Sequence, residues 1–108
     1  MTPSKSVYQR LQEWYQGQCD GDWEHNNGVK IESLDNPGWM LTVDLGDTEW
    51  VDLKADLHRV VRSENDWCQY LISKWQFKGA GGPLNIEEVI ESFLNLVTPP
   101  QPKINVVL

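Results

Sequence analysis

The chain has 108 residues, of which 40% are hydrophobic and 10% aromatic, and this composition fits one globular domain and excludes a disordered chain. Nine Lys and Arg residues against 16 Asp and Glu residues give a formal net charge of −7. This charge argues against nucleic acid and anionic membrane as direct partners and favours a basic protein or a cation. Ten of the 16 acids lie in residues 13–53, where Lys30 is the only base.

No signal-peptide or membrane-spanning pattern is present in the sequence. The N-terminal residues contain no apolar signal region, and no run approaches the roughly 18 apolar residues that a membrane span needs. We therefore expect a soluble, cytoplasmic protein. Cys19 and Cys68 fit neither a disulfide framework nor a zinc site by their number and spacing, so we expect both to be reduced.

The first predicted element is a helix over about residues 4–16. Apolar side chains recur there at three- and four-residue spacing at Val7, Tyr8, Leu11, Trp14 and Tyr15. Either Thr2-Pro3 or the pair Ser6 and Gln9 can form its N-terminal cap, and Gly17 is expected to end it. The loop that follows, residues 17–28, is too rich in Asp, Asn and Gly to hold regular structure throughout.

Alternation of apolar and polar residues then predicts a series of antiparallel strands. Residues 29–32 and 39–45 are expected to form a hairpin around Asn36-Pro37-Gly38. Pro37 would take the second position of this turn, and Gly38 would supply a positive φ at the third. The remaining strand segments are residues 49–53, 57–63, 67–73 and 75–78, the last of which is expected to end at the glycines that follow.

A second helix is expected to begin after Asn85, because Glu88 follows three residues later and the pair forms a capping box. Its apolar stripe is Ile86, Val89, Ile90, Phe93, Leu94 and Val97. The order of elements predicts an α+β fold, in which an antiparallel meander sheet of about five to six strands is flanked by an N-terminal and a C-terminal helix on one face. Residues 1–98 would form this single domain, and residues 99–108 a Pro-rich tail.

The densest polar cluster is Asp20, Asp22, Glu24 and His25. Its spacing begins like a calcium loop, but the sixth position is His25 rather than Gly, and the twelfth is Ile31 rather than Glu. No repeated Cys and His spacing indicates zinc. We therefore expect no metal and no cofactor. Two interpretations of the cluster stay open, a capped and solvated loop over a packed Trp23, and an acidic surface that faces a partner.

Catalytic patterns are weak throughout the sequence. The acids that follow Cys19 disfavour a reactive thiolate, and no Ser or Cys motif accompanies His25 or His58. We therefore expect no catalytic residue and no enzymatic activity. Two alternatives stay open, namely a small-ligand pocket lined by Trp23, Trp50 and Trp67, and a small enzyme that uses Cys19 or His25.

Several short motifs, taken together, resemble the immunity protein 53 family over about residues 8–97. They are Leu11-Gln12-Glu13-Trp14-Tyr15, Cys19-Asp20-Gly21-Asp22-Trp23-Glu24-His25, Gly28-Val29-Lys30-Ile31-Glu32, Leu34-Asp35-Asn36-Pro37-Gly38-Trp39, Asn65-Asp66-Trp67 and Gly81-Gly82-Pro83-x-Asn85-x-Glu87-Glu88. The resemblance implies a bacterial polymorphic toxin system, in which a small cytoplasmic protein binds a toxin domain and neutralises it stoichiometrically. The Pro-rich tail lies outside the resemblance.

The expected partner is thus a cognate toxin domain with a basic surface. A nuclease would fit, because an acidic surface can occupy a cleft that otherwise binds phosphate. The candidate partner-binding residues are Asp20, Asp22, Trp23, Glu24, Asp44, Asp47 and Asp66. Among them Trp23 is the expected aromatic anchor. The sequence indicates no particular oligomeric state.

Overall fold

The computed structural model describes residues 5–97, so the Pro-rich tail predicted for residues 99–108 lies outside the described residues. The elements follow one another as α1 (Val7–Gln18), α2 (Trp23–Asn26), β1 (Val29–Leu34), β2 (Gly38–Asp44), β3 (Ala55–Ser63), β4 (Asp66–Ser73), β5 (Gln76–Gly81) and α3 (Ile86–Val97). The predicted α+β class is confirmed. No helix within residues 5–97 has the length and hydropathy that crossing a bilayer requires.

The five strands form one antiparallel sheet in the order β1-β2-β5-β4-β3. The predicted meander is therefore kept in two parts, a β1–β2 hairpin and a β3–β4–β5 run, and β5 returns to pair with β2. β5 lies in the centre of the sheet and continues through the glycines where it was expected to end, and α3 packs closely on it. A Cβ at Gly79 would lie 2.8 Å from Val89 Cγ1, so only glycine leaves room for the helix.

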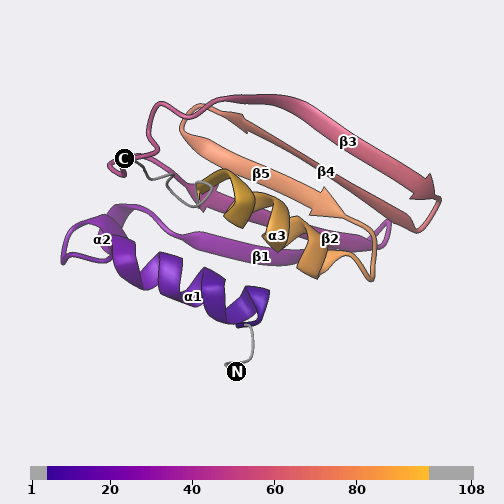
Figure 1. Ribbon diagram of the computed structural model, residues 1–108, viewed down its shortest axis with the longest axis horizontal. Coiled ribbons are helices and arrows are strands. Elements are labelled where there is room, and N and C mark those ends of the chain that lie inside the picture. Colours follow the sequence, from indigo (N-terminus) through magenta and orange to yellow (C-terminus); the bar gives the residue numbers. More distant parts are fainter. Residues whose placement is uncertain (1–4, 98–108) are drawn as a thin grey trace, which may run out of the picture.

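Helices α1 and α3 lie on the same face of the sheet (Figure 1). α3 packs on β5, β2 and β4 and also against α1. Leu41, Phe77 and Phe93 are completely buried between these layers. The predicted apolar stripe of α3 is confirmed, because its side chains at 89, 90, 93, 94 and 97 are all buried. Burial of this stripe on the sheet stabilises the fold.

Helix α1 begins after Ser6, which belongs to one of the two predicted N-terminal caps, but it ends later than expected. Ser6 Oγ accepts a hydrogen bond from the Gln9 backbone N–H at 3.1 Å. Gly17 lies inside α1, since the helix continues to Gln18. Two bonds complete the last turn: Cys19 N–H donates to the Gln16 carbonyl at 3.2 Å, and the Gln18 amide donates to the Trp14 carbonyl at 3.2 Å. These bonds satisfy carbonyls that a helix end otherwise leaves free.

The strand predicted at residues 49–53 is wrong, because this stretch is a series of turns. Thr48 Oγ1 donates to the Leu45 carbonyl at 2.7 Å and accepts from the Trp50 N–H at 3.0 Å. Val51 N–H donates to the Thr48 carbonyl at 3.2 Å. Since these backbone groups are bonded locally, they cannot pair with a neighbouring strand.

The β1–β2 turn also differs from its prediction. The Asn36–Pro37 bond is cis, and Gly38 does not have the positive φ that was expected. Glycine is required at position 38 for another reason. A Cβ there would lie 2.3 Å from the Gly81 carbonyl oxygen of the neighbouring strand. The close approach of β2 and β5 therefore excludes a side chain.

The capping box predicted at the start of α3 is not formed as expected. The Asn85 side-chain amide donates to Glu88 Oε1 and to Asp66 Oδ1, each at 3.0 Å, and its own carbonyl oxygen has no partner. Arg62 donates to both of these carboxylates. The Asn85 side chain thus donates to a charged network, and its carbonyl oxygen does not accept from the backbone as the capping box required.

Candidate functional site

Two of the candidate acids build the turn that contains α2. Asp20 Oδ1 accepts from the backbone N–H groups of Asp22 at 2.9 Å and Trp23 at 3.0 Å. The Glu24 carboxylate accepts from Asp20 N–H at 3.0 Å and Gly21 N–H at 2.9 Å. The Trp23 and Asp22 N–H groups lower the pKa of Asp20, and backbone N–H groups, first its own, lower the pKa of Glu24. Both carboxylates therefore act as caps while they face solvent.

Trp23 lies beneath this turn and is only 3% exposed. Its indole Nε1 donates to the Gly46 carbonyl at 3.0 Å, and its ring packs edge-on against Trp14 with centroids 6.1 Å apart. Of the two interpretations of this cluster, the capped loop over a packed Trp23 is what the structure shows, and the ring of the expected aromatic anchor is buried rather than presented at the surface. Trp23 instead joins α2 to the connection between β2 and β3.

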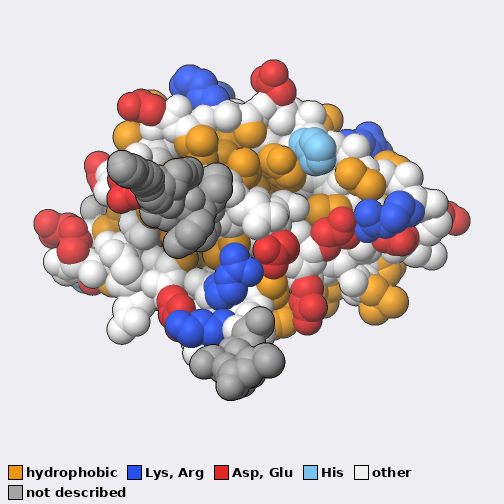
Figure 2. Space-filling view, in the orientation of Figure 1, with side chains coloured by type: hydrophobic (Ala, Val, Ile, Leu, Met, Phe, Trp, Pro, Cys, Tyr) orange, Lys and Arg blue, Asp and Glu red, His pale blue; other side chains and the backbone are white. Residues whose placement is uncertain are grey.

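The hydrogen bond from Trp23 to Gly46 brings together acids that are far apart in the sequence. Asp20, Asp22 and Asp47 line one hollow of about 250 Å³ together with Trp23 and Asn26. We call residues 20–26 and 44–53 the acidic end. Its carboxylates are Asp20, Asp22, Glu24, Asp44, Asp47, Glu49 and Asp52, and neither segment contains Lys or Arg. Figure 2 shows acidic side chains at the left end of the molecule, where α2 lies in Figure 1.

The carboxylates of the acidic end differ in what they bind. Within residues 5–97, the side chains of Asp22, Asp47, Glu49 and Asp52 accept no hydrogen bond and form no ion pair. No group of three or more His, Cys, Asp or Glu among the described residues is placed to hold a metal ion. These four carboxylates therefore have no part in the bonds that hold the described residues together.

Asp44 and Asp66, the other two candidates, are both engaged in structural bonds. Asp44 accepts from Gly28 N–H at 2.9 Å and from the Gln76 amide at 2.8 Å. Asp66 accepts from Arg62 and Asn85, and Arg62 lowers the pKa of Asp66. The strand register places Asp66 at the opposite end of the sheet from Asp44. The structure therefore gathers six of the seven candidate residues at one end and separates Asp66 from them.

The three tryptophans considered for a ligand pocket do not surround a common cavity. Trp23 and Trp50 both pack against Trp14, at centroid distances of 6.1 and 5.7 Å. Trp67 lines a separate hollow with Arg59 and Gln69. The geometry thus gives no support to the ligand-binding alternative.

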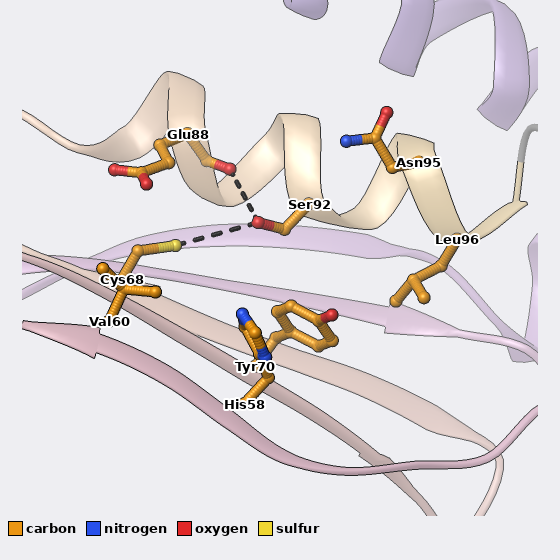
Figure 3. Close-up of a pocket in the computed structure, with 8 residues that line it drawn as sticks. All are labelled: His58, Val60, Cys68, Tyr70, Glu88, Ser92, Asn95 and Leu96. Atoms are coloured by element: carbon orange, nitrogen blue, oxygen red, sulfur yellow. Dashed lines mark hydrogen bonds between the residues drawn. The ribbon is translucent and has the colours of Figure 1, made fainter.

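The hollow between α3 and strands β3 and β4 contains several polar groups (Figure 3). Ser92 donates to the Glu88 carbonyl at 3.0 Å, so the Cys68 thiol, 3.8 Å from Ser92 Oγ, is the donor in their contact. Cys68 is 4% exposed, and burial raises its thiol pKa. The His58 ring lies against Tyr70, with centroids 5.1 Å apart. These groups assemble no activated nucleophile.

Of the residues considered for the enzymatic alternative, Cys19 serves the end of a helix and the two histidines lie apart from one another. Cys19 donates its thiol to the Tyr15 carbonyl at 3.3 Å, where it helps to end α1. His25 lies on α2, which leads into the edge strand β1, whereas His58 lies on the opposite edge strand β3. No shared site joins them.

Sequence analysis missed three residues at or beside the acidic end. Glu49 and Asp52 were assigned to a strand, although they lie in exposed turns. Trp75 was placed at the start of a strand, but it lies in the turn before β5 and is 63% exposed. Its carbonyl accepts from Leu45 N–H at 2.7 Å, beside the acidic end. No Gly or Asn marks that turn, so the sequence carried no signal for it.

The fold and the acidic end define a small acidic α+β protein in which buried polar groups serve structure and free carboxylates gather on one surface. The family model for immunity protein 53 matches residues 8–98. The chain therefore belongs to the immunity protein 53 family, and membership implies a toxin partner. No curated protein and no solved structure matches the chain.

Proposed function

We propose that this immunity protein binds its cognate toxin domain directly, through the acidic end, and neutralises it stoichiometrically without catalysing a reaction. The observation that carries the proposal is the meeting of two acidic segments at one surface. Residues 20–26 and 44–53 contain seven carboxylates and no Lys or Arg, and the Trp23–Gly46 bond holds the segments together.

The electrostatic consequence is attraction of a basic surface. Seven negative charges on one end create a field that steers a positively charged protein towards it and raises the association rate. A toxin that acts on nucleic acid has a basic cleft for phosphate groups, and the acidic end would occupy it. We place this encounter in the cytoplasm, where an immunity protein protects the cell that makes the toxin.

The carboxylates of the acidic end have two different roles. Asp20 and Glu24 fix the turn through backbone hydrogen bonds. Asp22, Asp47 and Glu49 have free carboxylates and can pair with Lys or Arg side chains of the toxin. Trp23 contributes by holding the surface rigid rather than by touching the partner, since rigid surfaces lose less entropy on binding.

Co-expression in a bacterial host tests the proposal. The cognate toxin domain is expressed alone and together with this protein, and growth is recorded. We expect growth arrest with the toxin alone and normal growth when both are present at similar levels. Equal arrest in the two cultures, with this protein soluble in the extract of the culture that co-expresses it, would contradict the proposed function.

A further inference from the structure

Trp75 is the one tryptophan of the described residues that is mostly exposed, at 63%. It lies with Lys74 in the two-residue turn between β4 and β5. Exposure of so large an apolar ring costs solvation free energy without contributing to the core. The core therefore does not explain why tryptophan occupies this position.

The backbone of this turn makes the choice of residue still less favourable. Lys74 has φ 53° and Trp75 has φ 63°, a region that non-glycine residues seldom adopt. Such hairpin turns favour Asn-Gly, because glycine takes positive φ without steric cost. Strain of this kind concentrates at sites that serve a function. Local energetics would thus favour glycine where the chain has tryptophan.

Trp75 also borders an apolar hollow beside the acidic end. The hollow has a volume of about 370 Å³, and Val51, Leu53, Ala55 and Ile72 line it with Trp75. In Figure 1 the β4–β5 turn lies at the same end of the sheet as α2. The neighbouring strand pairing agrees, since Gln76 pairs with Asp44. An exposed aromatic ring and an apolar hollow thus adjoin a rim of carboxylates.

The charges around this hollow indicate what kind of partner fits. Lys54, Lys74 and Asp56 also line it, so the charged side chains of the hollow itself sum to +1 and the hollow takes an apolar rather than a basic side chain. The negative charge beside the hollow comes from the carboxylates of the adjoining acidic end. A second copy of this chain would bring the same −7 charge and the same acidic end, and like charges would repel. A basic partner is therefore the complementary occupant.

We propose that Trp75 and this hollow, together the Trp75 site, form the apolar anchor at which the basic toxin docks. The toxin places an apolar side chain in the hollow against the indole ring, and its Lys and Arg residues face the acidic end. This arrangement of an aromatic centre and a charged rim is typical of binding hot spots. The inference rests on the proposed function and adds to it the residue that contributes most of the affinity.

The test is the affinity of full-length Trp75→Gly for the purified toxin domain, measured by calorimetry beside wild type. Because glycine relieves the positive φ, the variant should melt at or above the wild-type temperature. Loss of a hot-spot aromatic should weaken toxin binding about 30-fold or more. Trp75→Asn, which also tolerates positive φ, serves as a second variant and should lose affinity in the same way.

Leu84→Ala is the matched control. Leu84 is 92% exposed and follows β5 at the opposite end of the sheet, so its truncation should leave the affinity unchanged. If both Trp75 variants bind as tightly as wild type, the Trp75 site is overturned while the proposed function stands. If they change the oligomeric state in light scattering and not the toxin affinity, the occupant is a second copy and the inference is wrong. Failure of wild type to bind the toxin would overturn the proposed function itself.

Discussion

The indole Nε1 of Trp23 donates a hydrogen bond to the backbone carbonyl of Gly46, 3.0 Å away. Through this bond the α2 turn and the β2–β3 connection become one surface, although each is a separate loop in the sequence. The Trp23 ring also packs against Trp14 in the core. The acidic end is therefore built on a buried aromatic contact.

Trp23→Phe should lower the free energy of unfolding by about 2 kcal/mol, because the Gly46 carbonyl loses its donor and the smaller ring leaves a void. Urea denaturation measures this change. Trp75→Phe is the control, and its exposed ring predicts a change within about 0.5 kcal/mol of zero. Equal stability of the two variants would show that the Trp23–Gly46 bond does not hold the acidic end.

Neutralising free carboxylates of the acidic end should slow association with the toxin and leave stability nearly unchanged. The variant Asp22→Asn/Asp47→Asn/Glu49→Gln removes three charges that accept no hydrogen bond among the described residues. We expect a lower association rate and a weaker dependence of that rate on salt, measured by stopped flow or surface plasmon resonance.

The matched control for this variant removes three exposed acids from the opposite end of the sheet. Asp35→Asn/Glu64→Gln/Glu87→Gln changes the net charge by the same amount but leaves the acidic end intact. Its association rate should stay closer to wild type. Equal slowing in the two triple variants would mean that net charge alone, rather than this surface, governs the encounter.

Acid should weaken the α2 turn through Asp20 and Glu24. Because hydrogen bonds lower the pKa of both groups in the folded protein, their contribution is fully present above the ordinary carboxyl pKa of about 4 and is lost as the pH falls through the folded values. Wild type should therefore lose stability between pH 5 and pH 2 by more than Asp20→Asn/Glu24→Gln does. Urea denaturation across roughly this range checks it. The same pH dependence in both proteins would be evidence against the caps.

Two glycine substitutions should have opposite effects on stability. Gly38→Ala places a Cβ 2.3 Å from the Gly81 carbonyl oxygen, so the free energy of unfolding should fall by about 2 kcal/mol or more. Gly17→Ala meets nothing within 4 Å and lies inside α1, so stability should rise by about 0.5–1 kcal/mol. Thermal denaturation of the two variants and of wild type measures both changes in stability. A Gly38→Ala variant as stable as wild type would contradict the close approach of β2 and β5.

The elements that could be predicted are those whose side chains repeat with a clear period. The spacing of the apolar side chains from Ile86 to Val97 matches a helix and not a strand. The alternation in β2 matches a strand and not a helix. The stretch at residues 49–53 has a similar alternation but forms turns, because the Thr48 hydroxyl bonds the local backbone. The strand order was also beyond periodicity, because the pairing of β2 with β5 joins segments that are far apart in the sequence.

The candidate site could be predicted only in part, for a physical reason. Composition identified the acidic segments, but it could not show that Trp23 is buried between them or that Asp66 lies at the other end. Those facts depend on the tertiary contacts of Trp23 with Gly46 and of Asp66 with Arg62 and Asn85. Exposure of Trp75 follows from a turn that no Gly or Asn marks. A sequence pattern cannot supply such information.

The central claim is that the free carboxylates of the acidic end receive the toxin. Isothermal titration of the purified toxin domain with wild type, and with Asp22→Asn/Asp47→Asn/Glu49→Gln, tests it most directly. The account predicts saturation at a fixed stoichiometry with wild type, and affinity at least about tenfold weaker for the triple variant with an unchanged melting temperature. Equal affinity of the two folded proteins would contradict it.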